Sequence, residues 1–187
     1  MAVRDTARRK LTYEDYVLFP EDGQRHEIID GEHYVSPAPS TKHQRTSMRL
    51  SSRLHVFAEE HRLGEVFPAP TDVLLSRYDI VQPDILFLSK ERSEILTEKN
   101  IQGAPDLVVE ILSDRTRRLD EGLKHGRYEL FGVREYWIVD PMADQVHVYR
   151  AEGEGFKKTA ELSAEAEDIL TTPLLPGFEI PLGDLFR

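Results

Sequence analysis

Two spacings of apolar residues recur along the chain, one typical of strands and one typical of helices. Apolar runs of strand length begin after Asp84 and after Asp106. Residues 41–62 instead place Leu50 and Leu54 at i and i+4, on one face of a helix. The succession of helices and strands predicts a mixed α/β chain. Further strands are expected over residues 66–67, 72–75, 135–140, 145–149 and 156–160.

The segment around Asp30 and Gly31 predicts a β-hairpin. This pair is favoured in two-residue type I′ turns, and apolar residues flank it on both sides. Because strand side chains alternate between the two faces of a sheet, Glu27 shares a face with Ile29. We therefore expect the carboxylate of Glu27 to point inward, near the sheet.

A second long helix is expected over residues 116–131, with Gly132 at its C-cap. Leu119, Leu123 and Leu130 would form its buried stripe. The helix would therefore pack on the sheet through leucine side chains.

The same helix carries Asp120, Lys124 and Tyr128 at i, i+4 and i+8, on a face away from Leu119 and Leu123. Taken alone, Lys124 is a surface residue paired with Asp120, an interaction of a few tenths of a kcal/mol. Tyr128 is equally compatible with a site and with an amphipathic position in the core.

Glu110 stands in the middle of an apolar strand, on the same face as Val108 and Leu112. A buried carboxylate is costly unless it is paired or ligates a metal. Asp84 begins another apolar run. The alternative to a functional role for Asp84 is that it only caps a strand or turn after Pro83. Two strands that each present one acid are able to hold a divalent cation with oxygen ligands.

The composition limits the class of protein. The chain has 187 residues, no cysteine and a net charge of −10. This length predicts a single domain over residues 1–187, and the absence of cysteine excludes disulfides and thiolate metal sites.

Residues 1–10 are polar and basic and predict a flexible tail, followed by a short helix capped by Thr12 and Asp15. No apolar run reaches the ~20 residues of a membrane span, so we expect a cytoplasmic protein.

Basic residues gather at the start of the helix expected over residues 41–62. No acid lies between Glu32 and Glu59, although an ordinary solvated helix face mixes both signs of charge. Such a stripe is able to attract nucleic acid even in an acidic protein. The alternative interpretation is an ordinary solvated helix face with no role in binding. Its members are Lys42, Arg45, Arg49 and Arg53, with His43 beside them.

The order of these blocks resembles the Uma-type restriction endonuclease family of the PD-(D/E)xK superfamily. The blocks run from Glu27 through Asp84 and Glu110 to Lys124 and Tyr128, and end in residues 132–137. The resemblance covers roughly residues 11–186. It implies an α/β (α+β) fold of restriction-endonuclease type, with a central mixed β-sheet flanked by helices.

The resemblance also implies roles for these residues. Asp84, Glu110 and the backbone carbonyl of Ile111 would hold Mg²⁺, for which Mn²⁺ is able to substitute. The superfamily's lysine normally stands where this chain has Leu112, so Lys124 on the next helix would replace it. Glu27 would add a carboxylate, and Tyr128 and Asp120 would support the site.

The function that we expect is therefore that of a metal-dependent DNA endonuclease, active as a homodimer. One alternative is a nucleic-acid-binding or interaction domain with the same fold and little catalysis. Another is a hydrolase of small phosphorylated substrates, which the acidic net charge favours.

Overall fold

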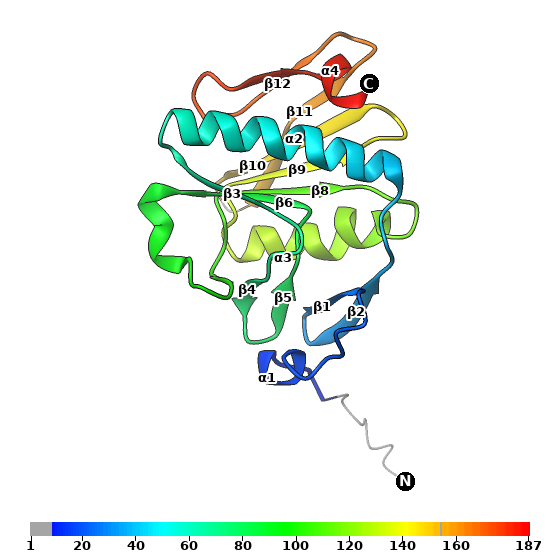
Figure 1. The fold of residues 1–187 in the computed structure, drawn as a ribbon, viewed down its shortest axis with the longest axis vertical. Coiled ribbons are helices and arrows are strands. Elements are labelled where there is room, and N and C mark those ends of the chain that lie inside the picture. Colours follow the sequence, from blue (N-terminus) through cyan, green and yellow to red (C-terminus); the bar gives the residue numbers. More distant parts are fainter. Residues whose placement is uncertain (1–8, 154) are drawn as a thin grey trace.

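The computed structural model describes residues 9–153 and 155–187, which form sheets covered by helices (Figure 1). Its helices are α1 (Tyr13–Tyr16), α2 (Thr41–Glu60), the 3₁₀-helix η1 (Lys90–Ile95), the π-helix η2 (Leu119–Lys124), α3 (His125–Leu130) and α4 (Leu182–Phe186). Its strands are β1 (Arg25–Ile29), β2 (Glu32–Ser36), β3 (Gly64–Pro68), β4 (Val73–Ser76), β5 (Asp79–Val81), β6 (Ile85–Ser89), β7 (Ile101–Gln102), β8 (Leu107–Ile111), β9 (Glu135–Asp140), β10 (Gln145–Glu152), β11 (Gly155–Ser163), β12 (Ile169–Thr171) and β13 (Glu179–Pro181).

The central sheet has six strands in the order β11-β10-β9-β8-β6-β3. Strands β8 and β9 run parallel, and their other neighbours in this sheet pair antiparallel. Helix α2 and the C-terminal segment pack on one face, through residues such as Leu50, Leu54 and Phe178. This arrangement confirms the expected mixed sheet flanked by helices.

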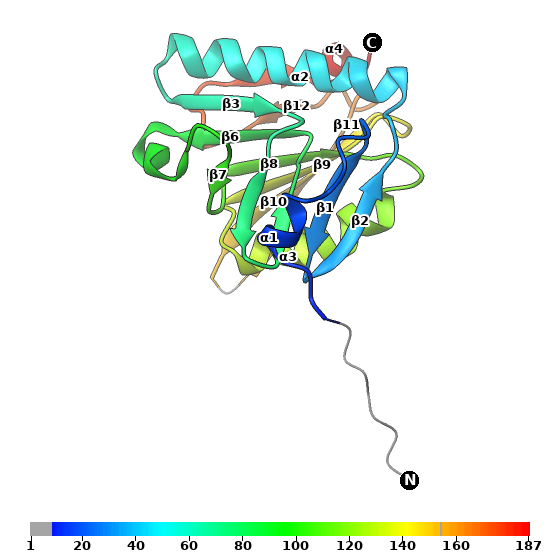
Figure 2. The same ribbon diagram turned by 60° about the horizontal axis from the view of Figure 1, so that its bottom comes forward.

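The opposite face of the central sheet is covered by α3 and by a second sheet, which the sequence did not predict as a separate layer (Figure 2). This second sheet has the strand order β2-β1-β5-β4-β7. Residues Leu107, Val109 and Ile111 of β8 face α2, whereas Val108 and Leu112 face this other side. The alternation predicted for this strand is therefore confirmed, and Glu110 lies on the face of the second sheet.

The predicted hairpin is formed by β1 and β2. Its turn residues Asp30 and Gly31 have φ angles of 53° and 80°, as a type I′ turn requires. The register pairs Glu27 with Tyr34. Glu27 is 1% exposed, which confirms its inward position.

The helical region after β8 differs from the prediction in its buried face. Leu130 is 66% exposed, and Leu119 and Leu123 are only partly buried. The buried residues are instead Asp120, Lys124 and Tyr128, on η2 and α3. Burying these polar groups is tolerable because they pair with one another and with acids on the strands.

The N-terminal predictions are confirmed only where the structure describes the chain. The capping box of α1 is present, with the backbone N–H of Thr12 donating to Asp15 Oδ2 at 2.9 Å. Residues 1–8 of the predicted tail lie outside the described residues, while Arg9 and Lys10 make ion pairs with Asp15 and Asp30. Within residues 9–153 and 155–187, no helix has the length and apolar character needed to cross a membrane.

Candidate active site

The two predicted acids stand opposite each other on neighbouring strands. Ile85 of β6 pairs with Val109 of the antiparallel strand β8. Asp84 immediately precedes β6 and Glu110 follows Val109 in β8, so the antiparallel register places the two acids across from each other on the same face of the sheet. Both are buried, with 3% and 2% exposure.

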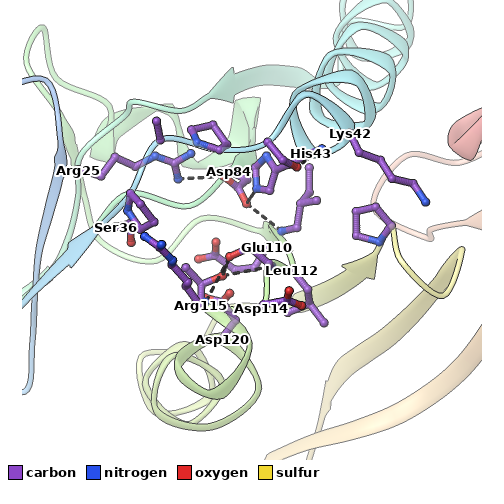
Figure 3. Close-up of a pocket in the computed structure, with 18 of the residues that line it drawn as sticks. Arg25, Ser36, Lys42, His43, Asp84, Glu110, Leu112, Asp114, Arg115 and Asp120 are labelled. Carbon is purple, nitrogen blue, oxygen red and sulfur yellow. Dashed lines mark hydrogen bonds and ion pairs between the residues drawn. The ribbon is translucent and has the colours of Figure 1, made fainter.

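Hydrogen-bond donors and a guanidinium group surround Asp84 (Figure 3). Arg25 Nη1 lies 2.8 Å from Asp84 Oδ1, and His43 Nε2 lies 3.0 Å from Oδ2. The backbone N–H of Ile111 also donates to Oδ2, at 2.8 Å. Burial alone would raise the pKa of Asp84, but the hydrogen bond and charge of His43, with Arg25 and the Ile111 N–H, hold it below its ordinary value.

The buried ammonium group of Lys124 forms ion pairs with three carboxylates. Its Nζ lies 2.8 Å from Glu27 Oε1, 3.0 Å from Glu110 Oε1 and 3.7 Å from Asp120 Oδ1. Burial would lower the pKa of Lys124, but these carboxylates raise it well above its ordinary value. Lys124 is therefore a buried ammonium group and not the exposed residue of the plain alternative.

Tyr128 fixes the orientation of Glu110. Its hydroxyl donates to Glu110 Oε1 at 2.7 Å, from the helix that follows Lys124. The Oε1 atom of Glu110 therefore accepts hydrogen bonds from both Lys124 and Tyr128. No hydrogen bond within the described part of the chain engages Oε2, so this oxygen is available as a ligand.

The buried cluster carries more acids than bases. Among the described residues, Glu27, Asp84, Glu110 and Asp120 pair with the cations Arg25 and Lys124 and with His43. The cluster therefore lacks two positive charges when every acid is ionised and His43 is neutral. Burial raises the pKa of Glu110 to about 8 and that of Asp120 to about 6 against the attraction of Lys124. Both shifts favour the protonated form of these acids, because the cluster has an excess of negative charge.

A cleft of about 460 Å³ opens onto this cluster. The loop of residues 36–40 and the start of α2 form one wall, and residues 113–116 form another. Asp84, Glu110, Asp120 and Lys124 line it together. Figure 3 shows the three acids around the hollow. The fold thus brings sequence-predicted residues from three separate segments to one accessible hollow.

The donor atoms in the cleft fit Mg²⁺ with few protein ligands. Among the described residues, no group of three or more His, Cys, Asp or Glu side chains is arranged to hold a metal ion. Asp84 Oδ1 is buried and contacts Arg25 Nη1 at 2.8 Å, so a cation here would share this oxygen with Arg25, and Glu110 would contribute its second oxygen. Mg²⁺ keeps several waters, so two carboxylates and a carbonyl such as that of Ile111 suffice.

The basic stripe on α2 divides into two parts in the structure. Lys42 and His43 line the cleft, and Lys42 Nζ lies 3.4 Å from Asp144. Arg49 donates to the carbonyl of Leu185, and Arg53 lies 3.8 Å from Asp184. Arg45 is exposed and makes no ion pair with any described residue. The acids missing from this segment of sequence are thus supplied by distant segments.

Sequence reasoning missed Arg25 as a member of the site. It lies two residues before Glu27 on β1, so both side chains lie on the same face of the hairpin. Its guanidinium is partly buried beside Asp84, and the charges of Asp84 and Glu110 raise its pKa despite burial. The alternation that pointed Glu27 inward was therefore a signal for Arg25 as well.

The comparisons with known proteins agree with this architecture. A crystal structure of "a putative nuclease belonging to DUF820" from Anabaena variabilis matches with a TM-score of 0.79 and 22% identity, covering 94% of this chain and 97% of that one. No curated protein matches the chain. The model of the Uma2 family, described as "Putative restriction endonuclease", matches residues 13–183. The chain, matched over nearly its whole length, belongs to the Uma2 family.

Proposed function

We propose that the protein is a metal-dependent DNA endonuclease that hydrolyses phosphodiester bonds. The observation that carries the proposal is the convergence of Asp84, Glu110 and Lys124 at one cleft, although they come from separate parts of the chain. The family and the nuclease fold of the similar structure support a nuclease function in general terms.

Asp84, Glu110 and the carbonyl of Ile111 are the proposed ligands of Mg²⁺, with Mn²⁺ as a substitute. When bound, the cation would act as a Lewis acid toward the phosphate and lower the pKa of water. The excess of buried carboxylates supports this assignment, because a charge of +2 offsets the deficit of positive charge in the cluster.

Lys124 is the proposed catalytic residue, whose ammonium group holds the attacking water or stabilises developing charge on the phosphate. Glu27 and Asp120 position its ammonium group, and Tyr128 positions Glu110. Lys42, His43 and Arg45 are the proposed contacts to DNA phosphates, because Lys42 and His43 line the cleft and Arg45 is exposed, whereas Arg49 and Arg53 contact the C-terminal segment.

A second candidate is a nucleic-acid-binding domain with little catalysis. The observation that favours it is that Arg25, His43 and the N–H of Ile111 already surround Asp84. In that case these contacts would be structural and would hold the carboxylate away from any cation.

Incubation of the purified protein with supercoiled plasmid, linear DNA and nucleotide phosphates, each with Mg²⁺ or Mn²⁺, separates these functions. The proposal predicts metal-dependent nicking or linearisation of plasmid, abolished by Glu110→Gln. Binding of DNA without cleavage under all conditions supports the second candidate, and hydrolysis of nucleotides alone contradicts both. Homodimerisation and a cytoplasmic location stay predictions.

A further inference from the structure

A second hollow continues from the cleft along strand β2. Its volume is about 630 Å³, and it shares Ser36, Pro37, Arg115 and Thr116 with the cleft, so the two hollows adjoin. Figure 3 labels Ser36 and Arg115 in the cleft lining. We call the second hollow the β2 groove, defined by Tyr34, Ser36, Arg115, Arg118, Leu119 and Leu123.

Two arginines of the β2 groove are left without acidic partners. Arg115 and Arg118 are exposed, and within the described ranges neither makes an ion pair. Their neighbour Arg117 is paired, at 3.1 Å from Glu121 and 2.7 Å from Asp140. In a protein of net charge −10, unpaired guanidinium groups beside the cleft favour an anionic ligand, and their planar fork fits phosphate.

The charges of this region are not uniform. Asp114 lines the cleft, but it does not line the β2 groove. The groove itself therefore has basic residues without an opposing carboxylate among its lining residues.

The remaining lining of the β2 groove is aromatic and apolar. Tyr34 lies opposite Glu27 in the hairpin and is partly buried, with Leu119 and Leu123 partly buried in the same hydrophobic cluster. A ring beside apolar side chains gives a surface on which a base is able to stack. Basic groups combined with such a surface are typical of sites for single-stranded nucleic acid.

The depth of the catalytic cluster supports the same class of ligand. Asp84, Glu110 and Lys124 are each at most 3% exposed, so a phosphate must enter the cleft to reach them. A duplex is stiff over the length of a binding site, so it must bend to bring a phosphate to a recessed group. A single strand bends into a groove, and its unpaired bases are free to stack on protein side chains.

We propose that the β2 groove binds a single-stranded DNA segment adjacent to the bond that is cleaved. Arg115 and Arg118 contact its phosphates, and a base packs against Tyr34, Leu119 and Leu123. The choice of DNA as the ligand rests on the function proposed above, and the inference adds the strandedness and the path of the substrate.

The test is a binding titration of the full-length protein without divalent metal, using fluorescein-labelled oligo(dT) and a duplex of equal length. Arg115→Gln with Arg118→Gln should weaken binding of the single strand roughly tenfold and lower its salt slope by about 1.4, because two phosphate contacts are lost. Tyr34→Ala should weaken it at least about fivefold through loss of stacking.

The matched control is the double variant Arg62→Gln with Lys90→Gln. Both residues line a hollow near Leu88 and Ser89, at the end of β6 opposite to Asp84. Their substitution removes two positive charges, as the groove variant does. The control should bind as the wild type does. An equal loss in the control, an unchanged salt slope in the groove variant, or tighter binding of duplex than of single strand would each overturn the inference.

Cleavage, measured separately on plasmid and single-stranded DNA, distinguishes this inference from the proposed function. A protein that binds oligo(dT) through the groove but cleaves nothing keeps the inference and contradicts the nuclease. A protein that cleaves DNA while the groove variant binds normally keeps the nuclease and contradicts the inference. A protein that neither binds nor cleaves contradicts both.

Discussion

The ammonium nitrogen of Lys124 lies 3.0 Å from Glu110 Oε1, although Lys124 stands on η2 and Glu110 on β8. In the superfamily that the chain resembles, the lysine normally stands two residues after the second acid, where this chain has the buried Leu112. The structure shows that a lysine from the following helix reaches the same carboxylate. Because Leu112 lies on the same face of β8 as Glu110, we expect the two backbone positions to be interchangeable for the ammonium group.

This interchange predicts a partial rescue. Lys124→Ala with Leu112→Lys should regain part of the cleavage that Lys124→Ala loses, because both positions face the second-sheet side of β8. The measurement is the cleavage rate of the double variant against that of Lys124→Ala. Leu112→Lys alone, which keeps Lys124, shows how far the buried charge disturbs the fold, and a folded double variant without any gain in rate would contradict the interchange.

Metal binding should depend on the two opposed acids. Titration calorimetry with Mn²⁺ is expected to show binding by the wild type that Asp84→Asn and Glu110→Gln each abolish, since each removes a charged oxygen ligand. The exposed Glu165→Gln is the control for loss of one acid. Undiminished affinity in both site variants, with their thermal unfolding intact, would show that the cation binds elsewhere.

The basic residues of α2 should separate into two functional groups. Arg45→Gln is expected to weaken DNA binding and reduce its salt dependence, because Arg45 is exposed and unpaired. Arg49→Gln should leave DNA binding nearly unchanged but lower the melting temperature, because Arg49 holds the carbonyl of Leu185. Anisotropy titration and thermal unfolding of each variant check this division, and equal effects on DNA binding would refute it.

Asp120 should make stability depend on pH. Burial, with repulsion from Asp84 and Glu27, outweighs the attraction of Lys124 and raises the pKa of Asp120 to about 6. An acid whose folded pKa lies above its unfolded value near 3.8 binds more protons when folded. Its contribution to stability is therefore greatest at low pH and falls as pH rises through about 6.

The Asp120→Asn variant removes this titration. Its melting temperature relative to the wild type should rise between pH 4.5 and pH 7, because only the wild type loses stability by ionising this side chain. Thermal unfolding at intervals across this range measures the difference. A difference that stays constant with pH would contradict the assignment.

Much of the sheet and hairpin could be predicted because their signals are local. The apolar alternation around Glu110 and the turn at Asp30 and Gly31 depend on neighbouring residues alone. The capping of α1 by Thr12 and Asp15 is local as well.

The buried face of η2 and α3 could not be predicted from periodicity. That reasoning assigns leucines to the core and charged residues to solvent. Lys124 is buried instead because it pairs with Glu27 and Glu110, which lie on the strands β1 and β8. The pairing of Arg53 with Asp184 has the same origin, since the two are far apart in sequence. Long-range partners decide which polar residues are buried, and a single sequence does not display them.

The most direct test of the account is the single-turnover cleavage rate of Lys124→Met, which removes the charge and keeps most of the side-chain volume. Removing one group that stabilises the transition state typically costs roughly 10²–10³ in rate. We therefore predict a loss of at least roughly a hundredfold, with the Kd for DNA nearly unchanged and the affinity for Mn²⁺ not weakened. A variant that is folded by circular dichroism and cleaves at the wild-type rate would contradict the catalytic role of Lys124.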